Sequence, residues 1–145
     1  SAQEIRHFGI EPKAALLSHS NFGSHDDPAA TKMHQALRMV RRQCPDLEIE
    51  GEMRGDLALS ESIRHNRFPD SLLEGQANLL IMPNQGAANI ACNLVKVVGE
   101  GIIVGPLLLG VATSAHIATP NTTVRGLLNM TALAAVQAQR CVQSR

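Results

Sequence analysis

Short apolar runs alternate with stretches of helical periodicity along almost the whole chain, and this alternation limits the fold more than any other feature. The runs expected to form strands are 14–18, 47–53, 77–82 and 101–105. Helices are expected from Pro28 to the turn at Pro45, over 56–66 and 85–99, and from about Thr122 onward. This repeated alternation indicates an α/β protein, a three-layer α/β/α fold with a mainly parallel sheet.

Ligands of parallel α/β sheets bind beyond the carboxyl ends of the strands. The connections that follow the predicted strands therefore hold the candidate site residues. They are the segments 18–28, 53–56, 83–86 and 104–121.

The serine-rich segment SHSNFGSHDDP, residues 18–28, is the strongest candidate. Its hydroxyls and the N–H groups around Gly23 suit a phosphate held at a helix N-terminus. The hydroxyls belong to Ser18, Ser20 and Ser24. A turn that only caps the next helix explains the same letters, because Asp27 followed by Pro28 is a common helix start. The histidines and aspartates here fit no familiar metal-ligand spacing, so we predict no metal site.

Two further segments offer polar groups at predicted helix starts. Asn84 follows a strand in PNQGAAN, and HIATPNTTVR at 116–125 precedes the last helix. The second segment contributes Thr119, Asn121, Thr122 and Arg125. These groups either bind an anion or cap the helices that follow them.

Three glutamates are spaced by two residues in the predicted strand 47–53. Glu48, Glu50 and Glu52 therefore share one face of that strand. Paired carboxylates can perform acid–base chemistry, but a solvent-exposed strand face explains the spacing at least as well.

Composition argues against several classes of partner. The formal net charge is zero and the only aromatic residues are three Phe, which does not favour nucleic-acid binding. The longest apolar run, 101–112, is interrupted by Gly105 and Pro106 and is too short to cross a bilayer. Three separated cysteines without a CxxC pair and the lack of a visible signal peptide lead us to expect a cytoplasmic protein.

Four segments resemble the phosphotransacetylase (phosphate acetyltransferase) family. LLSHSNFGS is similar to its LSxSxxGS, PDLEIEGEMRGDLAL to PDLxIDGExQxDAA, ANLLIMPNQGAANIACNL to ANvLIfPdLxAGNIxYKL, and VGPLLLGV to GPxLxGL. The resemblance implies a fold like that of isocitrate and isopropylmalate dehydrogenases, of which this chain is the C-terminal half. Residues 14–112 would form the cleft part, and 113–145 a further cleft segment and the last helix.

The family transfers an acetyl group between coenzyme A and phosphate, and its motif for this chemistry is DLSRGCSxxD. The matching segment here is IATPNTTVRG. Thr119 stands at the serine position, Pro120 at the arginine and Gly126 at the later aspartate. Because proline carries no guanidinium to neutralise phosphate, this departure implies binding without turnover.

The C-terminal segment GPLLLGVATSAHIATPNTTVRGLLNMTALAAVQAQ resembles the end of large NADP-dependent malic enzymes, in which a malic enzyme is fused to a phosphotransacetylase-like domain. NFGS, RFPDS and MPN fit the same branch. This resemblance implies a regulatory domain that senses acetyl-CoA and helps to build a homo-oligomer, with a dimer through this region. The N-terminal malic enzyme part would hold NADP and Mg²⁺ or Mn²⁺, and this chain no cofactor.

Two alternatives stay open. An active phosphate acyltransferase would need Arg125, or an arginine outside the given sequence, to supply the missing charge. A structural oligomerisation domain would keep only a vestigial site. On the regulatory interpretation, acyl-CoA or phosphate is predicted to bind to Ser18, Ser20, Asn21, Gly23, Ser24, Asn84, Thr119, Asn121, Thr122 and Arg125.

Overall fold

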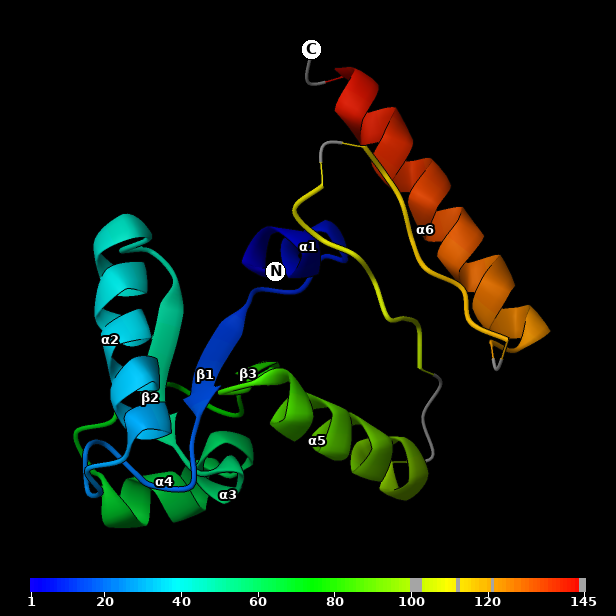
Figure 1. Cartoon of the computed structure of the whole chain (residues 1–145). Helices are drawn as coiled ribbons and strands as arrows, with labels where there is room; N and C mark the ends of the chain where they lie inside the picture. The colour runs from blue at the N-terminus through cyan, green and yellow to red at the C-terminus, as the bar shows by residue number, and fades with distance from the viewer. Residues whose placement is uncertain (100–102, 112, 121, 144–145) are drawn as a thin grey trace. The chain divides into compact units, whose positions relative to one another are not determined.

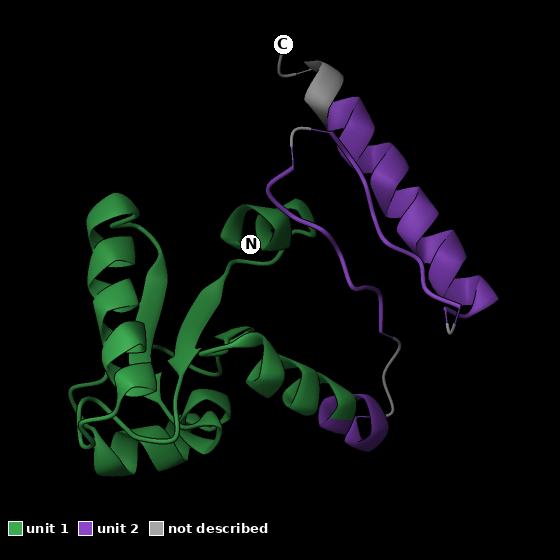
Figure 2. Cartoon of the chain, viewed as in Figure 1, with its two compact units in different colours: residues 1–93 green, residues 94–145 purple. Residues whose placement is uncertain are grey.

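The computed structural model describes residues 1–99, 103–111, 113–120 and 122–143. Two compact units divide the chain, Ser1–Asn93 and Leu94–Arg145, and Figure 2 colours them separately. We describe each unit by itself.

The first unit contains a three-stranded sheet in the order β2-β1-β3 (Figure 1). The central strand, β1 (Lys13–Leu17), pairs in parallel with β2 (Glu48–Met53) on one side and with β3 (Leu79–Ile81) on the other. The prediction of an α/β fold with a parallel sheet is confirmed. All three strands therefore end at one edge of the sheet, where the candidate loops begin.

Both faces of the sheet are covered, because alternate residues of β1 point to opposite sides. One face packs against α2 (Pro28–Gln43) in a cluster that contains Ala14, Leu16, Met33 and Leu37. The other face packs against α3 (Gly55–Leu59) in a cluster that contains Ala15, Leu17, Leu57 and Ala58. The first unit is thus built in three layers, helix, sheet and helix.

The remaining helices are α1 (Ala2–His7), α4 (Glu61–Arg67), α5 (Gln85–Val98) and α6 (Val124–Gln143). The predicted helices at 28, 85 and about 122 are confirmed, whereas α1 was not predicted. Residues 103–105 form no strand, so that part of the predicted strand 101–105 is wrong, and residues 101 and 102 lie outside the described residues. An apolar run forms a strand only where a neighbouring strand is available to pair with it.

The single helix predicted over 56–66 is instead two helices, α3 and α4. Ser60 separates them with an extended backbone at φ −132° and ψ 107°. Its hydroxyl accepts the N–H of Ile63 at 3.4 Å, which makes Ser60 the N-cap of α4. Serine competes in this way with a continuous helix, because its side chain replaces a backbone acceptor.

Two of the three glutamates of β2 are buried and Glu48 keeps 29% of its side-chain surface, so a solvent-exposed strand face is wrong for Glu50 and Glu52. Glu50 and Glu52 keep only 5% and 0% of their accessible surface. Glu50 accepts hydrogen bonds from the loop that covers it, namely from Ser71 Oγ, Leu72 N (3.0 Å) and Leu73 N (3.4 Å). The loop supplies the donors that water would otherwise provide, and this compensates for burying the carboxylate.

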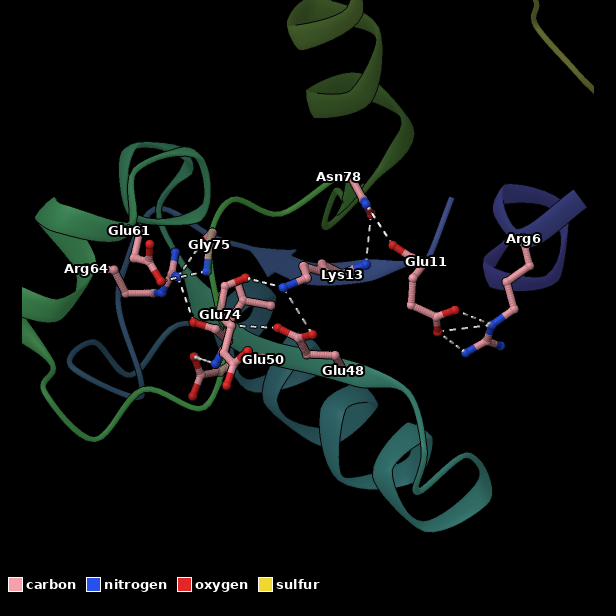
Figure 3. Close-up of polar contacts among 11 residues, drawn as sticks. Arg6, Glu11, Lys13, Glu48, Glu50, Glu61, Arg64, Glu74, Gly75 and Asn78 are labelled. Atoms are coloured by element: carbon pink, nitrogen blue, oxygen red, sulfur yellow. Dashed lines mark hydrogen bonds and ion pairs between the residues drawn. The ribbon is translucent and has the colours of Figure 1, made fainter. Parts of the chain in front are cut away.

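Arg64 of α4 holds the same loop from its other side and is 0% exposed. Its guanidinium donates to Leu57 O (2.7 Å), Leu73 O (2.7 Å), Gly75 O (2.6 Å) and Ser71 Oγ (3.0 Å). Figure 3 shows Arg64 beside Gly75 and, further along, Glu48 accepting the N–H of Glu74 at 2.7 Å. Each of the three glutamates of β2 therefore accepts hydrogen bonds from a neighbouring loop and helps to position it.

Gly51 allows β2 to pass close to β1. Its φ is +145°, and a Cβ at this position would lie 2.6 Å from the carbonyl oxygen of Leu16. We predict that Gly51→Ala lowers the free energy of unfolding by about 3 kcal/mol or more, because backbone conformation and close approach both oppose a side chain. Urea denaturation measures this loss.

Gly55→Ala is the matched control, since nothing lies within 4 Å of its added Cβ. It should change the free energy of unfolding by no more than about 1 kcal/mol. Equal losses for the two variants would contradict this account of the β1–β2 contact.

Candidate ligand-binding site

One buried carboxylate fastens the serine-rich loop to the end of β2. Glu52 Oε2 accepts the hydroxyl hydrogen of Ser20 at 2.8 Å, and Oε1 accepts the N–H of Gly23 at 2.7 Å. The carbonyl oxygen of Glu52 accepts the N–H of Phe22 at 2.7 Å. Hydrogen bonds to an ionised acceptor are about twice as strong as neutral ones. Ser20 and Gly23 therefore use these donors to shape the loop.

Asn21 and Ser24 complete the turn. The N–H of Asn21 donates to Ser24 Oγ at 3.1 Å, and Asn21 Oδ1 accepts the N–H of Arg54 at 2.9 Å. Between them, Phe22 adopts a φ of +49°, which is uncommon for a bulky side chain. Such a conformation persists where surrounding bonds fix it, as those of Glu52 and Asn21 do here. A direct role of these loop residues in ligand binding stays a prediction.

A pocket of about 490 Å³ lies at the carboxyl edge of the sheet, entirely within the first unit. Ser18 and Asn84, both predicted as site residues, line it together. The other lining residues are Leu17, His19, Ala29, Gly55, Met82, Pro83, Ala87 and Ala91. The sequence brings these segments together because parallel strands deliver their following loops to the same edge. Most of the wall is apolar, with a few polar groups, as in many small-molecule sites.

Asn84 has a structural role at this pocket. Its Oδ1 accepts the N–H of Ala87 at 2.9 Å, so Asn84 caps the start of α5. The side-chain NH₂ donates to no residue in the described part of the chain. Asn84 is thus held in one orientation by the cap and keeps a donor for a ligand.

Charged groups stand beside the pocket. Arg54, which precedes Gly55, makes a bidentate ion pair with Asp56. The hydrogen bond from Arg54 holds the pKa of the Asp56 carboxyl below its usual value, and it raises the pKa of Arg54. His19 Nδ1 lies 4.0 Å from Asp27 Oδ2, and Lys32 Nζ donates to the carbonyl oxygen of Pro83.

The remaining predicted site residues belong to the second unit. Thr119 donates its N–H to Thr122 Oγ1 at 2.9 Å, and the two hydroxyls are 3.3 Å apart. Thr123 Oγ1 accepts the N–H of Gly126 at 3.0 Å and thereby caps α6. Arg125 is exposed and makes no polar contact with a described residue. Asn121 lies outside the described residues.

Two side chains, neither of which lines the pocket, hold segments near it in a way that the sequence did not predict. Glu52 was assigned to a strand face, although a glutamate at the end of a strand is well placed to bond the neighbouring loop. Lys32 gave no signal, because its contact with Pro83 joins residues far apart in sequence. Ala87 and Ala91 are four residues apart on α5 and so share one face of the helix, which agrees with their place on the pocket wall.

Two negative findings apply to the described residues alone. None of the helices there has the length and apolar character needed to cross a membrane. No group of three His, Cys, Asp or Glu side chains in that part of the chain is arranged to hold a metal ion.

The fold and the pocket define an α/β domain of the class that binds ligands beyond the carboxyl ends of parallel strands. The sequence model described as "Phosphate acetyl/butaryl transferase" matches residues 1–135. This chain therefore belongs to the phosphate acetyl/butaryl transferase family.

Relatives come from two kinds of enzyme. The NADP-dependent malic enzyme of Escherichia coli K12 is 56% identical over 140 residues, which cover 96% of this chain and 18% of that enzyme. The phosphate acetyltransferase of Paracoccus denitrificans is 35% identical over 127 residues, 88% of this chain and 40% of that protein. The EutD phosphotransacetylase from Staphylococcus aureus superposes with a TM-score of 0.84 at 28% identity, covering 97% of this chain and 43% of its own. The chain thus spans less than half of each.

We predict that Glu52→Ala loosens the serine-rich loop. The substitution leaves the N–H of Gly23 without its acceptor and removes a carboxylate with 0% exposure, so stability should fall by about 2–4 kcal/mol. Amide hydrogen exchange at Gly23 should become faster than global unfolding explains. Glu74→Ala, which removes an exposed carboxylate, is the control and should leave both measurements unchanged. Unchanged exchange in Glu52→Ala would contradict the role of Glu52.

The Arg54–Asp56 pair predicts a pH dependence. Because the pKa of Asp56 is lower in the folded than in the unfolded protein, the pair stabilises the fold above the ordinary aspartate pKa. This contribution is lost as pH falls through the lowered pKa, and it is small because the Asp56 side chain is 40% exposed. The difference in melting temperature between wild type and Asp56→Asn should shrink on acidification from about pH 6 to about pH 3. Arg54→Gln should reproduce that pattern, and a constant difference would refute it.

Proposed function

We propose that this chain is the acetyl-CoA-sensing, phosphotransacetylase-like domain of a longer malic enzyme, and that it binds acyl-CoA without transferring the acyl group. The observation that carries this proposal is the segment at 119–126. Thr119, Pro120 and Gly126 stand there where the resemblance to transferases expects serine, arginine and aspartate. The identity to a malic enzyme, 56%, also exceeds the 35% to a phosphate acetyltransferase.

Loss of the arginine weighs most against turnover. Transfer to or from phosphate places several negative charges at the reacting centre, and a missing donor at such a centre costs on the order of 3 kcal/mol of barrier. Pro120 offers neither charge nor N–H. The hydroxyl of Thr122 is turned toward Thr119, and that of Thr123 caps α6. This pattern supports a segment that has kept its fold and lost its reactive groups.

The pocket at the carboxyl edge supports binding. Leu17, Met82 and the alanines of α5 give an apolar wall, while Ser18 and Asn84 add hydrogen-bonding groups. An acyl-pantetheine arm has the same mixed character, with methylene groups between amides and a thioester. The rest of the malic enzyme would be joined to this domain in one polypeptide, and copies of that polypeptide would form a cytoplasmic homo-oligomer.

The test uses the full-length protein. Acetyl-CoA should raise its melting temperature, by a stabilisation of about 2.7 kcal/mol at a hundredfold excess over Kd, and should lower malate oxidation with NADP. Acetyl-CoA plus phosphate should give no acetyl phosphate. Asn84→Ala should weaken the thermal shift while leaving malate oxidation without effector unchanged.

Two results would overturn the proposal. Phosphate-dependent release of CoA that disappears in Arg125→Ala would establish an active transferase. In that case the exposed Arg125 guanidinium would supply the missing positive charge. No thermal shift with acetyl-CoA, together with loss of the oligomer when the domain is deleted, would establish a structural oligomerisation role.

A further inference from the structure

The basic side chains near the carboxyl-edge pocket differ in how their charge is compensated. Arg54 is paired with the carboxylate of Asp56 through two hydrogen bonds. His19, which lines the pocket, lies 4.0 Å from the carboxylate of Asp27. Each of these two already faces an acidic partner.

Lys32 is the exception. It lies on α2 one turn after Ala29, which lines the pocket, and its Nζ donates to the carbonyl oxygen of Pro83, another lining residue. Its ammonium is therefore held by a neutral acceptor, the carbonyl oxygen of a residue that lines the pocket. Among the described residues, no carboxylate pairs with it.

This arrangement leaves one positive charge and two N–H donors uncommitted. An ammonium carries three donors, and Pro83 uses one of them. A phosphate oxygen is the acceptor such a compact charge binds well, because it adds both a hydrogen bond and charge neutralisation. The residues that line the pocket include neither Lys nor Arg, and Arg54 beside it is already paired with Asp56.

We propose that Lys32 binds the phosphate groups of the ligand and so makes this pocket selective for a phosphorylated acyl thioester. This inference rests on the proposed function, since it assigns a recognition residue to the same pocket.

Two ligands separate the phosphate from the thioester. Acetyl-CoA carries a diphosphate and a further phosphate on its ribose, whereas acetyl-pantetheine has the same acyl end and no phosphate. If Lys32 contacts phosphate, its removal weakens acetyl-CoA and leaves acetyl-pantetheine unaffected. A general loss of structure would weaken both.

The experiment measures both affinities by calorimetry on full-length wild type, Lys32→Gln and Arg38→Gln. Arg38 is an exposed cation further along α2, so its removal changes the net charge equally. We expect Lys32→Gln to bind acetyl-CoA about ten- to hundredfold more weakly than wild type and to bind acetyl-pantetheine with the wild-type affinity. Arg38→Gln should bind both ligands with the wild-type affinity. Raising the salt concentration should weaken acetyl-CoA binding more in wild type than in Lys32→Gln.

The other outcomes each have one meaning. If wild type and Lys32→Gln bind acetyl-CoA with equal affinity, Lys32 does not bind the phosphate groups, and the proposed function is unaffected. Equal weakening of both ligands in Lys32→Gln also overturns the role of Lys32, because phosphate recognition would not touch acetyl-pantetheine. Wild type that binds neither ligand overturns the proposed function and this inference with it.

Discussion

The shape of the serine-rich loop at the candidate site depends on the hydrogen bonds that the carboxylate of Glu52 accepts. This carboxylate stands at the end of a strand, has 0% exposure, and accepts donors from Ser20 and Gly23 in the loop that follows the neighbouring strand. A buried carboxylate is costly unless its lone pairs are used, so loop and strand stabilise each other. Glu52 thereby fastens the serine-rich loop to β2, and the first two residues of that loop, Ser18 and His19, line the pocket.

Much of the fold follows from the sequence. The alternation of apolar runs and helical stretches predicts a parallel sheet, and Asp27 before Pro28 marks the start of α2, where the Asp27 carboxylate accepts two N–H groups. The sequence pattern does not show which side chains are buried. Spacing by two places Glu50 and Glu52 on one face, yet only tertiary structure shows that both are buried and that two different loops supply their donors. A periodic pattern indicates which face of a strand a side chain lies on, but it does not indicate whether that face is buried.

The site was predictable to the same extent. Ser18 and Asn84 line one pocket because parallel strands end at a common edge, a rule that needs no coordinates. Lys32 reaches that pocket only through its contact with Pro83, which sequence spacing cannot express. On α5, the apolar side chains of Ile90 and Leu94 are 66% and 61% exposed. Such surfaces are typical of elements that meet further polypeptide, and this chain covers 18% of the malic enzyme it matches.

On the function proposed above, the carboxyl-edge pocket binds acyl-CoA, and the segment that carries Pro120 does not transfer the acyl group. The most direct test is a crystal structure of the full-length protein grown with acetyl-CoA and phosphate together. The account predicts intact acetyl-CoA, its thioester beside Ser18 and Asn84. Acetyl phosphate and free CoA in that pocket, or acetyl-CoA bound only elsewhere, would contradict it.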